Sequence, residues 1–100
     1  VDGALECIEK VTANSDVLIS IGHTNATSEE AEAGIKAGVR HTTHLFNAMT
    51  PLTHRSPGVV GAALSDSKVS TELIADTFHV NKVSKNTMRF IRIHRLARNI

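Results

Sequence analysis

Helical and strand-like sequence patterns alternate along the whole of this 100-residue chain. Apolar residues at helical spacing predict helices, and short β-branched runs between turn residues predict strands that are buried on both faces. This alternation indicates parallel strands joined by right-handed crossovers. We therefore expect an α/β structure, either a doubly wound sheet or a slice of a (β/α)8 barrel. A full barrel takes about 250 residues, so this chain covers about three βα units and cannot close.

The expected elements follow one another in the order α-β-α-β-α-β-α. Helices are predicted at residues 4–13, from Thr27 to Gly38, at residues 58–64 and from Lys82 or Ser84 onward; strands are predicted at residues 17–21, 39–45 and 70–75. Thr27 and Glu30 fit a capping box, and Gly38 is a natural helix stop. Residues 46–57 form a long loop with two prolines, of a kind that is often functional. We expect residues 1–100 to be a piece of one domain that is cut at both ends, with no linker.

Composition excludes several classes of function. A net charge of +1 gives no electrostatic reason to bind nucleic acid or a membrane surface, and no apolar run approaches the roughly 20 residues of a membrane helix. The basic run from Arg89 to Arg98 lacks interleaved aromatics and is interpreted as a solvated helix face. The lone Cys7 is expected to be a small buried residue without a disulfide, which favours a reducing, cytoplasmic location.

Histidines stand out in a chain that has six of them but only three aromatic residues. His23 follows the first predicted strand, His44 lies at the end of the second, and His79 lies four residues past the third. The carboxyl ends of parallel strands face one way. Three imidazoles converging there would suit zinc, because catalytic zinc usually has three protein ligands and a water. A single histidine at a strand end is more often a capping group, so both interpretations stay open. His41, three positions before His44, is expected to point to the opposite face and to be structural.

Three polar residues outside the predicted strands also have two interpretations each. Arg55, in the long loop, is either a bidentate ligand for a phosphate or carboxylate or a solvated arginine. Its neighbour His54 either touches substrate or is surface. Asp76 is either a base or hydrogen-bond partner of a histidine, or a cap on the following turn.

Four motifs resemble the N-acetylglucosamine-6-phosphate deacetylases of the amidohydrolase superfamily. The similarity runs from about Val17 to Val80. The motifs are IGHTNAT at residues 21–27, THLFNAM at 43–49, RSPG at 55–58 and IADTFHV at 74–80. The resemblance implies a distorted (β/α)8 barrel, of which this chain would cover approximately strands five to seven. It also implies that His23 and His44 bind a catalytic divalent metal, with Zn²⁺ expected first and Fe²⁺, Mn²⁺ or Co²⁺ as alternatives.

The same resemblance assigns substrate contacts. Asn47 and Ala48 match the loop that holds the sugar phosphate, and His79 matches a histidine that contacts the substrate. Arg55 matches an arginine that reaches the 6-phosphate in the neighbouring subunit of a homodimer. The implied substrate is a phosphorylated amino sugar, with no nucleic acid or membrane partner.

The resemblance also places two functional groups outside this chain. The third metal ligand is a glutamate expected before Val1, and the general acid–base is an aspartate expected after Ile100, so no catalytic acid or base lies within the chain. The implied reaction is metal-dependent hydrolysis of N-acetylglucosamine 6-phosphate to glucosamine 6-phosphate and acetate, and these 100 residues alone are expected to be inactive. The alternatives are a dihydroorotase-like or isoaspartyl-peptidase-like amidohydrolase, or a non-catalytic truncated fragment.

Overall fold

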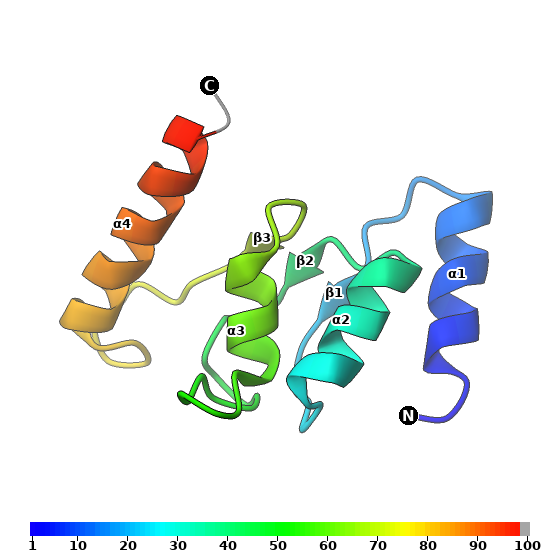
Figure 1. Ribbon diagram of the computed structural model, residues 1–100, viewed down its shortest axis with the longest axis horizontal. Coiled ribbons are helices and arrows are strands. Elements are labelled where there is room, and N and C mark those ends of the chain that lie inside the picture. Colours follow the sequence, from blue (N-terminus) through cyan, green and yellow to red (C-terminus); the bar gives the residue numbers. More distant parts are fainter. Residues whose placement is uncertain (99–100) are drawn as a thin grey trace.

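The computed structural model describes residues 1–98, and it describes side chains as far as Ile91. Figure 1 shows a small central sheet with helices packed on it and one helix at either end. The elements are α1 (Ala4–Asn14), β1 (Ser20–Ile21), α2 (Ser28–Ala37), β2 (His41–Thr42), α3 (Gly58–Ser65), β3 (Ser70–Thr71) and α4 (Lys82–Arg98). The predicted order is therefore confirmed. The arginines at 92, 95 and 98, which were assigned to a solvated face, lie outside the described side chains.

The three strands form one parallel sheet in the order β1-β2-β3. Ser20 is in register with His41, and His41 is in register with Ser70. This arrangement confirms the α/β class and the parallel strands expected from the alternation, whereas the assignment to strands five to seven of a barrel stays a prediction. Each strand has two residues, but single hydrogen bonds continue the pairing on both sides, such as Thr43 N–H to Ile21 O at 2.8 Å and Leu45 N–H to Glu72 O at 2.8 Å.

The two faces of the sheet differ in character. Helices α2 and α3 cover one face (Figure 1), and the core there is built from fully buried Leu45, Val39, Val59, Val60 and Val69. The open face is polar: the hydroxyl of Ser20, on β1, lies 2.7 Å from the hydroxyl of Thr43, the residue after β2.

The prediction that the first strand is buried on both faces is wrong. Val17 and Leu18 are 60% and 61% exposed. They precede the edge strand β1, and β1 has a hydrogen-bonded neighbour on one side, β2. A second error concerns Cys7, which was expected to be buried; it lies on α1, whose own residues are not buried, and its thiol is exposed.

Helix α2 begins and ends as predicted. The Thr27 hydroxyl accepts from Glu30 N–H, and the Glu30 carboxylate accepts from Thr27 N–H, both at 3.1 Å, which completes the capping box. Gly38 ends the helix with a φ of 142°. A side chain there would also come within 2.5 Å of Thr12 Cγ2, so the glycine lets α1 pack against this end of α2.

One hydroxyl fixes the long loop after β2. Thr50 Oγ1 donates to Ala26 O at 2.7 Å and accepts from Val59 N–H at 2.8 Å. It therefore joins the loop after β1, the loop after β2 and the start of α3. None of the described helices is both long enough and apolar enough to cross a membrane.

Candidate metal and substrate site

The loops that follow β1 and β2 run side by side. Thr24 N–H donates to Ala48 O at 3.0 Å, and Thr24 forms a parallel bridge with Met49. This pairing extends the sheet beyond the short strands and brings the IGHTNAT and THLFNAM motifs together. It therefore carries two of the predicted histidines toward the same point.

His23 and His44 meet through the same ring atom. Their Nε2 atoms lie 3.0 Å apart, and the rings pack edge to face with centroids 4.8 Å apart. One Nε2 must carry a hydrogen and the other must accept it in this arrangement. Tetrahedral zinc with bonds of about 2.0–2.1 Å separates two nitrogen ligands by about 3.3 Å. A shift of a few tenths of an ångström would thus let both Nε2 atoms bind one ion, with release of the shared proton.

The second ring nitrogen of His44 also fits a metal ligand. His44 Nδ1 is buried and has no hydrogen-bond partner among the described residues. Histidines that bind metals usually donate their other N–H to a carboxylate, carbonyl or water, which fixes the tautomer. His44 Nδ1 could therefore donate to such an acceptor, but no described residue of this chain supplies one.

A third metal ligand is absent from the described part of the chain. Among residues 1–91, whose side chains are described, no group of three His, Cys, Asp or Glu side chains could bind a metal ion. The expectation that His79 converges with His23 and His44 is therefore wrong. His23 and His44 each follow their strand by two residues, whereas His79 follows β3 by eight, and the chain has turned in between.

Both histidines sit in a backbone conformation that L-residues rarely adopt. The φ angle is 45° at His23, 29° at His44, 80° at Phe46 and 54° at Ala48. Each such residue costs about 1–3 kcal/mol, and such strain clusters at functional sites. Sequence reasoning missed this feature, because none of these positions is a glycine.

The predicted phosphate loop lies next to the histidine pair. A depression of about 460 Å³ is lined by His23, Thr24, Asn25, Ala48 and Met49. Asn47 N–H donates to His44 O at 3.0 Å, and its side-chain amide donates to Leu45 O at 3.3 Å. The structure thus places Asn47 and Ala48 in a folded-back turn, three and four residues after His44.

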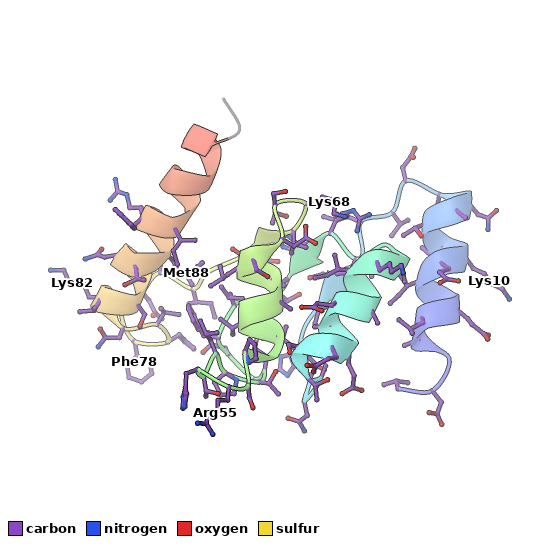
Figure 2. The ribbon with its side chains drawn as sticks, viewed as in Figure 1. Lys10, Arg55, Lys68, Phe78, Lys82 and Met88 are labelled. Carbon is purple, nitrogen blue, oxygen red and sulfur yellow. The ribbon has the colours of Figure 1, made fainter. Side chains whose placement is uncertain are left out.

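Arg55 lies at the tip of a tight turn. Thr53 N–H donates to Ser56 O at 3.0 Å, and Ser56 N–H donates to Thr53 Oγ1 at 3.1 Å, so His54 and Arg55 occupy the exposed tip. Figure 2 shows the Arg55 side chain pointing away from the body of the molecule. It lines a separate depression of about 270 Å³ beside the start of α2.

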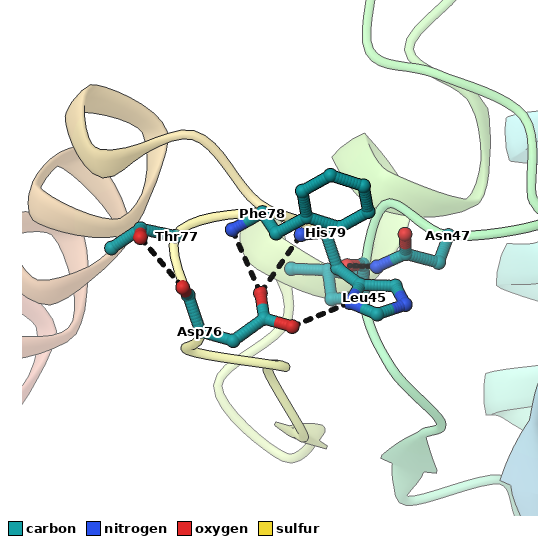
Figure 3. A network of polar contacts seen from close by, with 6 residues as sticks. All are labelled: Leu45, Asn47, Asp76, Thr77, Phe78 and His79. Atoms are coloured by element: carbon teal, nitrogen blue, oxygen red, sulfur yellow. Dashed lines mark hydrogen bonds and ion pairs between the residues drawn. The ribbon is translucent and has the colours of Figure 1, made fainter.

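His79 pairs with Asp76 instead of the other histidines. Its Nδ1 lies 2.7 Å from Asp76 Oδ2, and Asp76 Oδ1 accepts from the N–H groups of Phe78 and His79, both at 2.8 Å (Figure 3). These hydrogen bonds, led by the one from His79 N–H, lower the pKa of Asp76 to about 2. Asp76 is therefore both a turn cap and a histidine partner, the two interpretations that the sequence left open.

His41 has a separate set of partners. Its Nδ1 lies 2.6 Å from Ser70 Oγ and its Nε2 lies 2.8 Å from Glu72 Oε2, both near β3. His41 thus joins β2 to the strand beside it and takes no part in the His23–His44 pair. This agrees with the structural role expected from its position on the strand.

Curated proteins with sequences similar to this chain are deacetylases of phosphorylated amino sugars. No family model matches the chain. The chain is 48% identical over 66 residues to the N-acetylglucosamine-6-phosphate deacetylase of Bacillus subtilis, covering 66% of this chain and 17% of that protein. It is 42% identical over 79 residues to the N-acetylgalactosamine-6-phosphate deacetylase of a Shewanella species, covering 79% of this chain and 20% of that protein.

Solved structures give the same result. The N-acetyl-D-glucosamine-6-phosphate deacetylase of Mycobacterium smegmatis superposes with a TM-score of 0.85 at 40% identity, over 90% of this chain and 25% of that chain. A mutant of the same enzyme, with the same TM-score, was solved in complex with N-acetyl-D-glucosamine-6-phosphate. The chain thus spans about a sixth to a quarter of the length of these relatives. These comparisons give no support to the dihydroorotase-like or isoaspartyl-peptidase-like alternatives.

Proposed function

Because this chain is homologous to one segment of the N-acetylglucosamine-6-phosphate deacetylases, we propose that it forms part of the active site of such an enzyme. The reaction is hydrolysis of the N-acetyl group of N-acetylglucosamine 6-phosphate to glucosamine 6-phosphate and acetate. The observation that carries this proposal is the 3.0 Å approach of His23 Nε2 and His44 Nε2 at paired strand ends. Their motifs are those that resemble the deacetylases.

His23 and His44 would hold a divalent metal, which we propose to be zinc. When bound, such an ion supplies Lewis acidity, which acidifies a water and polarises a carbonyl oxygen. Both rings must be neutral and must present Nε2 lone pairs, so the proton between them leaves on binding. A glutamate ligand and an aspartate general acid–base complete the proposed site from outside these residues.

The remaining proposed residues bind and orient the sugar phosphate. Asn47 and Ala48 lie three and four residues after His44, and Ala48 lines the same depression as His23, so a phosphate held there fixes the substrate close to the histidine pair. Binding energy from this remote group can then orient the acetamide for attack by water. His79 is proposed to contact the sugar.

Arg55 is proposed to act across a homodimer. Its exposed position at the tip of the Thr53–Ser56 turn, pointing away from its own chain (Figure 2), supports a contact with the neighbouring subunit. A guanidinium binds a phosphate through two parallel hydrogen bonds. Loss of Arg55 should therefore weaken substrate binding without removing metal.

A second substrate is favoured by the relatives. Two of them, at 41% and 42% identity, are named as N-acetylgalactosamine-6-phosphate deacetylases. That sugar differs from N-acetylglucosamine 6-phosphate at one ring hydroxyl, and it presents the same acetamide and phosphate.

We also assign the reaction to the cytoplasm, because an exposed unpaired thiol such as Cys7 is best kept reduced there.

A graft into a related enzyme tests this function. The segment of the Mycobacterium smegmatis deacetylase that superposes on this chain is replaced by this chain, so that the host supplies the rest of the barrel. The graft is expected to release acetate from N-acetylglucosamine 6-phosphate, and the unphosphorylated sugar is expected to react far more slowly. Assays with N-acetylgalactosamine 6-phosphate decide between the two sugars.

The outcomes are separated by two variants of the graft. His44→Ala should abolish acetate release, while His41→Gln, which keeps a polar side chain beside Ser70 and Glu72, should retain it. A well-folded graft that deacetylates neither sugar phosphate would contradict the proposed function.

A further inference from the structure

The turn that carries His79 is organised around one carboxylate. Asp76 accepts three hydrogen bonds, from the N–H groups of Phe78 and His79 and from His79 Nδ1, at distances of 2.7–2.8 Å (Figure 3). The aromatic ring of Phe78 packs edge to face on the His79 ring, with centroids 5.7 Å apart. The imidazole is therefore held from two sides, although it remains partly exposed.

The turn is maintained against a conformational cost. Thr77, between Asp76 and Phe78, has a φ of 66°. This is the left-handed region, and a β-branched residue is a genuine outlier there. A strain of about 1–3 kcal/mol persists only where the surrounding contacts impose it. The Asp76 carboxylate makes three hydrogen bonds within this turn, two to backbone N–H groups and one to the His79 ring, so it is the main polar group that holds His79 in place.

The charge on Asp76 decides which nitrogen of His79 carries the hydrogen. An ionised carboxylate can only accept hydrogen bonds, and the pKa of Asp76 is lowered to about 2 by these bonds. His79 Nδ1 must therefore be the donor. In the neutral ring, Nε2 is then left as a bare acceptor. Such an atom can accept a hydrogen bond from a hydroxyl group but cannot donate one to a carbonyl oxygen.

We propose that Asp76 is a positioning residue, which fixes the Nδ1–H form of His79 so that Nε2 accepts a hydrogen bond from a hydroxyl group of the sugar phosphate. The inference rests on the proposed function and deepens it. It assigns neutral His79 to recognition of the sugar, and it excludes neutral His79 from polarising the acetamide carbonyl. It also gives Asp76 a role that the site residues named above do not share.

The first test reads the tautomer of His79 in the grafted enzyme, labelled with nitrogen-15 at histidine, by NMR of the imidazole rings. An unconstrained histidine in water favours the Nε2–H tautomer, whereas the proposal requires the Nδ1–H tautomer, so the two can be told apart. In its neutral form, His79 is expected to favour Nδ1–H by about tenfold or more, the range of hydrogen bonds to charged groups. Asp76→Asn should reverse this preference, because the amide can cap the turn with its oxygen and donate to Nδ1 with its nitrogen.

Two variants control for the turn itself. Asp66→Asn alters another aspartate cap, whose Oδ1 accepts from Lys68 N–H at 2.8 Å, and should leave His79 unchanged. Thr77→Gly removes the strain but retains Asp76, and should also keep the Nδ1–H form. If wild-type His79 is mainly Nε2–H, or if Asp76→Asn does not change the ratio, the proposal is overturned. Backbone amide shifts of Phe78 and His79 report whether the turn has formed in each variant.

The second test measures kinetics in the grafted enzyme. Asp76→Asn is expected to raise KM about tenfold with little change in kcat, since a contact to a hydroxyl group is made equally in substrate and transition state. Asp66→Asn should alter neither parameter. A reversed tautomer with unchanged KM would disprove the role in binding but leave the deacetylase function standing. An inactive wild-type graft would instead contradict the deacetylase function, and the NMR result would then decide whether Asp76 sets the tautomer.

Discussion

At the scale of single residues, short contacts and unusual backbone angles determine where the side chains of the proposed site lie. The motifs predicted that His23 and His44 act together, and the structure brings their Nε2 atoms to 3.0 Å. The motifs did not reveal that both residues, with Phe46 and Ala48, have positive φ. No glycine marks these positions, and the strain arises from the pairing of two loops distant in sequence. Such tertiary effects leave no local signal.

The Asp76 turn leads to a prediction about pH. Asp76 has a pKa lowered to about 2 from an ordinary value of 3.8, mainly by the hydrogen bond from His79 N–H. A carboxylate with a depressed pKa stabilises the turn fully above pH 3.8, and this contribution disappears as the pH falls through about 2. Between pH 5 and about pH 3.5, the amide shifts of Phe78 and His79 are therefore expected to stay constant, and they are expected to move below pH 3.5.

An NMR titration of those two amides checks this expectation. A midpoint close to 3.8 would mean that the Asp76 carboxylate is not held by the turn. Asp76→Asn provides the control, because its amide does not ionise and the transition should vanish.

At the scale of elements, local signals predicted helices better than strands. The capping box at Thr27 and the stop at Gly38 depend on residues close in sequence, and both appear as expected. Strands depend on partners far along the chain, so apolar runs at residues 17–21, 39–45 and 70–75 overstated their length. The apolar Val17 and Leu18 indicated burial that β1, at the edge of the sheet, does not provide here.

The junction between the long loop and α3 gives a second prediction. Gly58 has a φ of 63°, and a side chain there would approach Pro51 O at 2.6 Å and Thr50 O at 2.7 Å. Gly58→Ala in the grafted enzyme should therefore be destabilising by about 1–3 kcal/mol. It should also displace the Thr50 junction and, with it, the turn that presents Arg55.

Thermal unfolding of the graft measures this effect against a matched variant. Gly34→Ala adds the same methyl group inside α2, where the nearest side-chain atom is 3.7 Å away, and alanine is favoured over glycine in a helix. Gly34→Ala should thus be neutral or stabilising. Equal melting temperatures for the two variants would argue against a special role of Gly58.

At the scale of the whole molecule, one face of the sheet is covered and the rest of the surface carries exposed apolar groups. Helices α2 and α3 cover one face (Figure 1), whereas Val17, Leu18, Phe78, Val83 and Phe90 are each more than half exposed. Strands β1 and β3 form the two edges of the sheet, and edge strands favour pairing with other chains. The α/β class could be predicted from the alternation of helical and strand-like sequence patterns. The same patterns contain no information on what covers the open face and the edges of the sheet.

This surface predicts that the 100-residue chain associates with itself in solution. Exposed apolar groups and open strand edges favour contacts between copies. Sedimentation velocity over a range of concentrations should show species larger than a monomer, in growing proportion as concentration rises. A purely monomeric chain with a sharp, reversible thermal transition would contradict this prediction.

The measurement that tests the account most directly is the metal content of the grafted enzyme and its histidine variants. We expect about one zinc ion per site in the graft, and loss of both metal and acetate release in His44→Ala. The matched variant is His41→Gln, three residues upstream, where the amide can keep the contacts to Ser70 and Glu72, and it should retain metal and activity. Unchanged metal content in His44→Ala would contradict the assignment of His23 and His44 as a ligand pair.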